Sequence, residues 1–258
     1  LYGHFVERGG VMPCEQAVVD QLNALLAEQL AGLAQDEEAF FNATQNAQVV
    51  RAAEQYYRAI YQGSTTSWNL RDQHMFDTLR ALLEHRGPQA RAVVWAHNSH
   101  IGNAAATEMG WKGQFNIGQL CRDAYGRDVV LSGMSTDRGQ VAAADDWDGD
   151  MHIKDVRPSR ADSWEHQFLE AGIAASLTDW RDPERETLRQ ALSETLLERA
   201  IGVIYRPESE LRSHYFQAVL ADQFDALVWI EQTQPVTALH LPKSQEPEPE
   251  DETFPFGV

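Results

Sequence analysis

Two histidines three positions apart are the residues of this sequence best suited to chemistry. The stretch AVVWAHNSHIGN places His97 and His100 directly after the apolar run Ala92–Ala96 and before a Gly-Asn turn. A neutral imidazole titrates near working pH, so such a pair can polarise a carbonyl, hold an attacking water or protonate a leaving alkoxide. Three interpretations follow: an acid/base pair, a metal site, or a structural pair whose rings are satisfied by backbone or by Asn98.

The spacing of the two histidines argues against metal. A catalytic zinc usually has three protein ligands, and the zincin pattern places two histidines four apart on a helix with a glutamate between them. Here the separation is three, Asn98 and Ser99 intervene, and the preceding run is apolar. Glu108 can reach the site in principle, but no spacing fixes it as a third ligand. We therefore expect no metal and no cofactor, and favour acid/base chemistry at His97 and His100.

A strand is the element expected to position this pair. Ala92–Ala96 is apolar throughout, which is typical of a strand buried on both faces of a parallel sheet. His97 then lies at the carboxyl end of that strand, where the catalytic and ligand-binding groups of open α/β sheets collect.

The remainder of the chain alternates helical and extended patterns. We expect helices over Glu15–Leu33, Asp36–Tyr61, Trp68–His85 (capped by Ser67), Phe115–Tyr125, Trp164–Ala171 (capped by Asp162-Ser163) and Glu184–Glu198. Further strands are expected over Asp128–Met134 and Gln140–Ala144, joined as a hairpin, and over Ile201–Tyr205 and Ala226–Ile230. This alternation predicts an α/β fold: a three-layer, largely parallel sheet with flanking helices and a helical N-terminal segment. We expect one domain over residues 1–243, followed by an acidic tail, 244–258.

A second polar group lies within the expected helix Trp68–His85. By helical period Asp72 falls on an apolar stripe, and Arg71 lies on the flank of that stripe. Buried charges are costly unless they are paired, so an ion pair that fixes the helix is one interpretation and a pocket role for Arg71 is the other. His214, beyond the expected strand Ile201–Tyr205, is interpreted as structural. The acidic run Asp145–Asp150 lacks the glutamate of a calcium loop and is interpreted as a polar loop.

Composition limits the partners. The formal charge of −18 over 258 residues argues against nucleic acid or an anionic membrane. Cys14 and Cys121 form no Cys-x-x-Cys motif, which favours a reducing cytoplasm over a disulfide framework. No apolar run approaches the roughly 20 residues of a membrane-spanning helix. Because the chain opens at Leu1 in a stretch without a helix cap, we expect that the natural N-terminus lies further upstream.

Two long runs resemble the second half of the erythromycin esterase family. The likeness extends from about Asn69 to Leu239, and its most specific element is Trp-Ala-His-Asn-Ser-His. The runs are NLRDQHMFDTLRALLEHRGPQARAVVWAHNSHIGNAAATEMG and ERAIGVIYRPESELRSHYFQAVLADQFDAL. The resemblance implies an α/β fold and metal-independent hydrolysis of a macrolide lactone. It also implies that His97 and His100 match the histidine pair that lines the family's active-site cleft.

One departure from the family pattern is serious. The family's proposed general base is a histidine in a Gly-Glu-x-Ser-His-Gly segment near its N-terminus, and the 258 residues contain no such segment. Ser99-His100-Ile101-Gly102 echoes it only superficially. We therefore expect the C-terminal portion of a longer esterase, inactive alone, in which the absent histidine activates water.

The expected reaction is hydrolysis of a small-molecule ester or lactone in the cytoplasm. His97 and His100 would orient the water, polarise the carbonyl or stabilise the oxyanion, and Arg71 and Glu108 are candidate substrate-binding residues. Two alternatives stay open. One is a non-catalytic or biosynthesis-associated small-molecule-binding domain. The other is a metal-dependent hydrolase that uses His97, His100 and one carboxylate.

Overall fold

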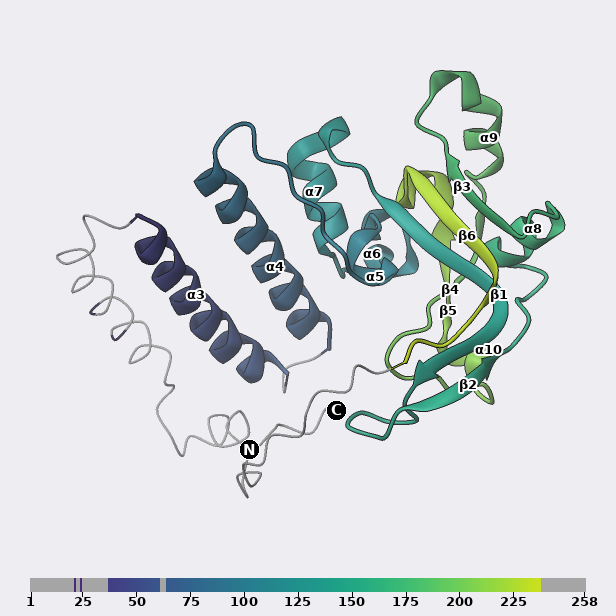
Figure 1. The fold of residues 1–258 in the computed structure, drawn as a ribbon, viewed down its shortest axis with the longest axis horizontal. Helices are drawn as coiled ribbons and strands as arrows, with labels where there is room; N and C mark the ends of the chain where they lie inside the picture. Colours follow the sequence, from purple (N-terminus) through teal and green to yellow (C-terminus); the bar gives the residue numbers. More distant parts are fainter. Residues whose placement is uncertain (1–20, 22–23, 25–36, 61–63, 238–258) are drawn as a thin grey trace. The chain divides into compact units, whose positions relative to one another are not determined.

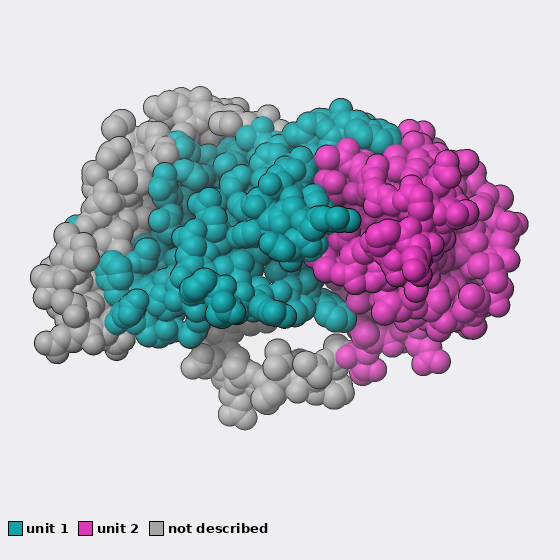
Figure 2. Space-filling model, turned by 90° about the horizontal axis from the view of Figure 1, so that it is seen from above, with its two compact units in different colours: residues 1–96, 109–129 teal, residues 97–108, 130–258 magenta. Residues whose placement is uncertain are grey.

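A computed structural model describes residues 21, 24, 37–60 and 64–237 of the chain (Figure 1). The chain divides into two compact units, coloured separately in Figure 2: residues 1–96 with 109–129, and residues 97–108 with 130–258. The expected tail 244–258 lies outside the described residues, as does the expected helix Glu15–Leu33 apart from residues 21 and 24. The expectation of one domain over residues 1–243 stays a prediction.

Three helices make up most of the described part of the first unit. They are α3 (Glu37–Ala59), α4 (Ser64–Arg86) and α7 (Ile117–Tyr125), followed by the short 3-10 turn η2 (Gly126–Asp128). α3 and α4 lie side by side (Figure 1). The helices expected over Asp36–Tyr61 and Phe115–Tyr125 are confirmed. α4 begins three residues before Ser67, so Ser67 is a buried residue within the helix and not its cap.

The stripe of α4 packs against α7 as its helical period predicts. Phe76 of α4 forms a buried cluster with Ile117 and Cys121 of α7, and Met75 and Leu79 pack against this cluster. Burial raises the pKa of the Cys121 thiol. The apolar stripe thus joins the two helices into one core.

Asp72 and Arg71 have separate uses in this unit. The fully buried Asp72 accepts a hydrogen bond through Oδ1 from the backbone N–H of Ile117, 3.1 Å away, at the N-terminus of α7. A carboxylate there satisfies an otherwise unpaired helical N–H and complements the helix dipole. The Arg71 guanidinium lies over the Trp68 ring, 4.7 Å from its centroid. The expected fixing role of Asp72 therefore acts on α7, through a backbone amide.

The second unit contains two β-sheets. The larger has the strand order β2-β1-β6-β3, and the smaller pairs β4 with β5. The bounds are β1 Ser132–Ala143, β2 His152–Val156, β3 Ala175–Asp179, β4 Thr195–Arg199, β5 Tyr215–Val219 and β6 Ala226–Thr233. β1 and β6 pair in parallel, whereas the β1–β2, β3–β6 and β4–β5 pairs are antiparallel.

An α/β fold is therefore confirmed, but the expectation of a largely parallel sheet is wrong for the described residues. For β1 and β2 the short connection explains the difference, because β1 reaches β2 through residues 144–151 alone and parallel neighbours need longer crossovers. The three-layer arrangement stays a prediction.

The described helices of this unit are short. α5 (Asn98–Ile101) and η1 (Ala104–Ala106) precede β1, and α8 (Trp164–Glu170), η3 (Pro183–Arg185), α9 (Glu186–Ala191), α10 (Glu210–Ser213) and α11 (Leu220–Gln223) lie between later strands. α6 (Glu108–Trp111) begins at the last residue before the first unit resumes. The expected cap of α8 is confirmed, because the Ser163 side chain accepts from His166 N. None of the described helices is both long and apolar enough to cross a bilayer.

Three expected strand and helix assignments fail in this unit. β1 runs unbroken through the expected hairpin, because Gly139 adopts a φ of +123° beside Thr233, where a Cβ would lie 2.3 Å from the Thr233 oxygen. The expected helix Glu184–Glu198 ends at Ala191, and its last part becomes β4 by pairing with β5. Ile201–Tyr205 forms only a single bridge, between Ile204 and Ala144. In the first two cases tertiary pairing outweighs the local pattern, and in the third the pairing that a strand needs is almost absent from the described residues.

The expected strand Ala92–Ala96 is not formed. Residues 91–97 have no regular secondary structure, and the side chains of Val93 and Trp95 are 93% and 83% exposed. A strand exists only where a neighbour completes its hydrogen-bond ladder. No strand of the described residues pairs with this segment, so the apolar composition alone does not make it β-structure.

We predict that Asp72→Ala destabilises the first unit. The substitution leaves the buried Ile117 N–H without its acceptor, which costs about 1–3 kcal/mol. Urea unfolding followed by circular dichroism measures this loss, with the exposed Asp123→Ala on α7 as the matched control. Equal unfolding free energies for the two variants would contradict the capping role.

Candidate active site

The histidine-bearing turn begins with His97, which caps the short helix α5. Its backbone is extended (φ −63°, ψ 150°), and its Nδ1 accepts from the backbone N–H of Ser99 at 3.2 Å. The Ser99 Oγ lies 2.9 Å from the same nitrogen, and Nε2 lies 3.0 Å from the Ile201 carbonyl oxygen. A backbone N–H can only donate and a carbonyl can only accept. The partners therefore place the proton of neutral His97 on Nε2.

The surroundings of His97 favour this neutral form. Although His97 keeps exposure to solvent, partial desolvation of its ring lowers its pKa below the ordinary histidine value. The hydrogen bond to the Ile201 carbonyl opposes that effect, and the charge of nearby His100 lowers the pKa further. His100 lies three residues on, half-buried in α5. The structure thus brings together the two histidines that the sequence singled out.

Asn98 attaches the turn to the central sheet. Its Nδ2 donates to the Met134 carbonyl at 2.7 Å, and its Oδ1 accepts from the Met134 N–H at 3.0 Å. Both backbone groups of a β1 residue are thereby paired by one side-chain amide. The far end of the turn is held as well, because Asn103 N donates to the Gln223 carbonyl. The positions of the histidines therefore follow from β1 and α11.

Two buried glutamates lie near Asn98. Asn98 Nδ2 is 3.5 Å from Oε1 of Glu198, and both Glu198 (β4) and Glu165 (α8) are buried. Burial, followed by repulsion from Glu165, raises the pKa of Glu198 to about 8. Burial also raises the pKa of Glu165, against the hydrogen bond from Arg199 N.

Arg199 anchors the small sheet to β1. The buried guanidinium donates to the carbonyls of Thr136 and Asp137 on β1 at 2.6 Å each, and to the carbonyl of Arg157 at 2.7 Å. It also pairs with the buried Glu210 at 3.1 Å. A buried guanidinium is unfavourable unless its N–H groups are hydrogen-bonded and its charge is paired, as they are here.

The remaining sequence candidates lie elsewhere. Glu108 accepts through Oε2 from the backbone N–H of Gln217 at 3.2 Å, so it attaches the start of α6 to β5. Arg71 lies in the first unit over Trp68. His214 contacts the Ser213 hydroxyl at 2.7 Å and the Ile204 carbonyl at 3.2 Å, as expected for a structural histidine. Substrate-binding roles for Arg71 and Glu108 stay predictions.

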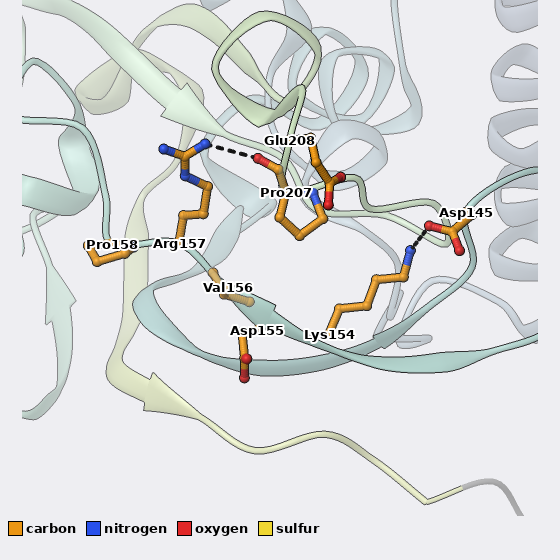
Figure 3. A pocket seen from close by; sticks show the side chains of 8 residues that line it. All are labelled: Asp145, Lys154, Asp155, Val156, Arg157, Pro158, Pro207 and Glu208. Atoms are coloured by element: carbon orange, nitrogen blue, oxygen red, sulfur yellow. Dashed lines mark hydrogen bonds and ion pairs between the residues drawn. The ribbon is translucent and has the colours of Figure 1, made fainter.

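A cavity of about 530 Å³ lies on the same unit, beside β2. Figure 3 shows the side chains that line it. Its lining residues are Asp145, Lys154, Asp155, Val156, Arg157, Pro158, Pro207 and Glu208. The Lys154 ammonium contacts Asp145 and the carbonyls of Ala144 and Tyr205, so its three protons are used within the protein. Neither His97 nor His100 lines this cavity, and we assign it no role in the reaction.

Metal ligands do not gather at the turn. Within the described residues, no three His, Cys, Asp or Glu side chains lie close enough together to hold a metal ion. The expectation of no metal and no cofactor stays a prediction.

Sequence reasoning missed the polar groups that hold the turn, namely Asn98, Glu165, Glu198 and Arg199. Asn98 was visible between the histidines, but nothing in its spacing pointed to Met134. The pattern predicts a helix that ends at Glu198, directly before Arg199. Charged residues directly after two leucines were the available signal for a buried ionic group.

We predict that nitrogen NMR of His97 shows the Nε2–H tautomer at pH 7. Its pKa lies below that of an unfolded histidine, so the associated stability is present above about pH 6.5 and is lost as the pH falls through the folded-state pKa. A His97→Gln variant loses this acid sensitivity. The Nδ1–H tautomer, or titration above the ordinary histidine range, would contradict the geometry.

Three solved structures share this fold. A Bacillus cereus protein matches 84% of this chain and 53% of its own at 19% identity, with a TM-score of 0.66. A succinoglycan biosynthesis protein matches 86% and 51% at 20% identity and a TM-score of 0.60. An erythromycin esterase mutant in its open conformation matches 88% and 55% at 15% identity and a TM-score of 0.52. The chain therefore spans about half the length of the solved structures it matches.

The likeness to the family also extends along the sequence. The sequence profile of the erythromycin esterase family matches residues 2–233, nearly the entire chain. The match includes the turn with both histidines and the six strands of the described residues. This chain belongs to the erythromycin esterase family.

Proposed function

We propose that this chain contributes the histidine-bearing half of a metal-independent ester or lactone hydrolase. The observation that carries the proposal is the turn His97–Ile101, in which two histidines are fixed to the central sheet in a chain of the erythromycin esterase family. Family membership supports a hydrolase relationship, whereas the substrate and the roles of individual residues are our inference.

The proposed reaction is attack of water on the ester carbonyl carbon. A general base takes a proton from the water as its oxygen bonds to that carbon, and the carbonyl becomes an oxyanion. The C–O bond to the leaving alcohol then breaks, and the alkoxide takes up a proton. Orientation of the water and stabilisation of the oxyanion lower the barrier to the first step.

His97 and His100 divide these tasks in the proposal. The Ser99 hydroxyl can rotate away from Nδ1 of His97, since that nitrogen keeps the backbone N–H of Ser99. A water can then donate to Nδ1 in place of the hydroxyl and be held there. His100 polarises the carbonyl and stabilises the oxyanion.

These residues do not include the family's Gly-Glu-x-Ser-His-Gly base. The proposal therefore assigns proton abstraction to a histidine outside the 258 residues, and activity is to be tested on the natural protein that carries them. The substrate is a small-molecule ester or lactone, with a macrolide lactone as the first compound to test. Arg71 and Glu108 are retained as candidate substrate contacts, and we place the reaction in the cytoplasm.

A second candidate is a non-catalytic, biosynthesis-associated binding domain. The similarity to a protein named for succinoglycan biosynthesis supports the association with biosynthesis in this alternative. A hydrolysis assay separates the two candidates, because a binding domain retains the small molecule unchanged.

We predict that His97→Ala or His100→Ala lowers kcat for ester hydrolysis by roughly 10²-fold or more in the natural protein, the usual scale for acid/base and oxyanion groups. The matched control is His152→Ala, an exposed histidine on β2 that should leave kcat unchanged. Full kcat in both His97 and His100 variants would make the pair structural.

We further predict that the purified protein contains no stoichiometric zinc and that chelators leave its hydrolysis unchanged. The physical reason is that the turn supplies two imidazoles with no third ligand fixed beside them. Elemental analysis showing one zinc per chain, lost in His97→Ala, would replace the acid/base account with a metal-dependent one.

A further inference from the structure

Two carboxyl groups share the buried space under the histidine-bearing turn. Glu165 projects from α8 and Glu198 from β4, and their side chains repel each other electrostatically. Both residues are almost completely shielded from solvent, at 1% and 3% exposure. Two ionised carboxylates in such a place are strongly unfavourable, because burial and like charge both penalise the second negative charge.

Three acceptor atoms at and near the pair have no hydrogen-bond donor among the described residues. Oε2 of Glu165, Oε2 of Glu198 and Oε1 of Gln223 are all buried, and none has a hydrogen-bond partner within the part of the chain that the structure describes. Gln223 on α11 also contacts Glu198 through its side chain. A buried acceptor without a donor loses its hydrogen bonds to water and gains none in return. A proton on one carboxyl group converts an acceptor into a donor and relieves this excess.

The surroundings place that proton on Glu198. Oε1 of Glu165 accepts from the Ser135 hydroxyl at 3.0 Å and from the Arg199 backbone N–H at 3.0 Å, and the Arg199 charge also favours its ionised form. Glu198 receives only side-chain amide contacts, from Gln223 and from Asn98 at 3.5 Å. Hydrogen bonds from hydroxyl and backbone donors stabilise a carboxylate, so Glu165 is the better anion of the two.

The charge on Glu198 determines how strongly it attracts the Asn98 amide. Asn98 Nδ2 carries two hydrogens: it donates to the Met134 carbonyl at 2.7 Å and has only a long contact, 3.5 Å, with Glu198. An ionised carboxylate is a stronger acceptor than a neutral acid. Loss of the proton therefore shortens the contact between Asn98 and Glu198, which displaces Asn98 and shifts the turn that begins at His97.

We propose that Glu198, protonated while the nearby Glu165 is ionised, is a positioning residue that holds His97 and His100 in place through the Asn98 amide. The protonated pair is the state in which the turn is seated on β1. The consequence for catalysis rests on the proposed function, whereas the proton on Glu198 and the movement of Asn98 do not.

Infrared spectroscopy of the 258-residue chain tests the proton on Glu198. At pH 7 the wild-type protein should show the C=O stretching band of a protonated carboxyl group, and this band should disappear as the pH rises through about 8. The band should be absent in Glu198→Gln and retained in the matched control Glu194→Gln, which alters an exposed carboxylate four residues earlier. Absence of the band in the wild type, or its persistence in Glu198→Gln, overturns the proposal.

NMR of the wild-type chain tests the positioning role. The Asn98 side-chain amide and the ring signals of His97 and His100 should shift with the same midpoint as the infrared band. These shifts should vanish in Glu198→Gln and remain in Glu194→Gln. Should Glu198→Gln fail to fold, the wild-type titrations decide alone. An Asn98 signal that does not move while the band titrates overturns the positioning role.

Hydrolysis by the natural protein completes the test. If the protein is active, kcat of the wild type should fall several-fold as the pH rises and the pair loses its proton, with KM unchanged. Glu198→Gln should abolish this alkaline limb of the pH profile of kcat. Retention of the limb in Glu198→Gln overturns the catalytic consequence. Absence of hydrolysis refutes the proposed function and leaves the spectroscopic results to decide the acid pair.

Discussion

The attachment of Asn98 to Met134 is the interaction on which the candidate site depends. β2 pairs only with Gly139–Ala143 of β1, so the earlier half of β1 has no strand of the described residues on that side. One amide side chain there makes both of the hydrogen bonds that a neighbouring strand would make with Met134. The donor and acceptor of the amide match those of a peptide group, which is why asparagine can replace backbone at a sheet edge.

The support beneath this attachment is polar and buried, which makes it specific and vulnerable. Arg199 joins β4 to β1 through the carbonyls of Thr136 and Asp137 and also contacts the Arg157 carbonyl and Glu210. The adjacent Glu198 contacts Asn98. Removing one partner of a buried ion pair leaves the other charge unpaired, so the loss destabilises the fold by more than the intact pair stabilises it. The arrangement thus couples the position of the histidines to the protonation of the glutamates. It also explains why β1, β4, α8 and α11 all contribute to the environment of a five-residue turn.

Local signals predicted the parts of the fold that local physics determines. The apolar period located α3, α4 and α7, and Ser163 marked the start of α8. The family resemblance is confirmed, and the two histidines do lie together. The other expected elements failed because they depend on pairing between segments far apart in the sequence. Thr195–Arg199 carries a helical pattern until β5 pairs with it, and Ala92–Ala96 carries a strand pattern that no described strand completes. Asn98 and Glu198 are one hundred positions apart, so no sequence pattern predicts their contact.

Amide hydrogen exchange at Met134 tests the central claim, that Asn98 seats the histidine-bearing turn on β1, most directly. The account predicts that the Met134 N–H is protected in the wild type and exchanges at least about tenfold faster in Asn98→Ala, a change worth about 1.4 kcal/mol in opening free energy. The amides that join β1 to β6 should keep their wild-type rates. An unchanged Met134 exchange rate in Asn98→Ala would contradict the account, since the turn would then be held by something other than this amide.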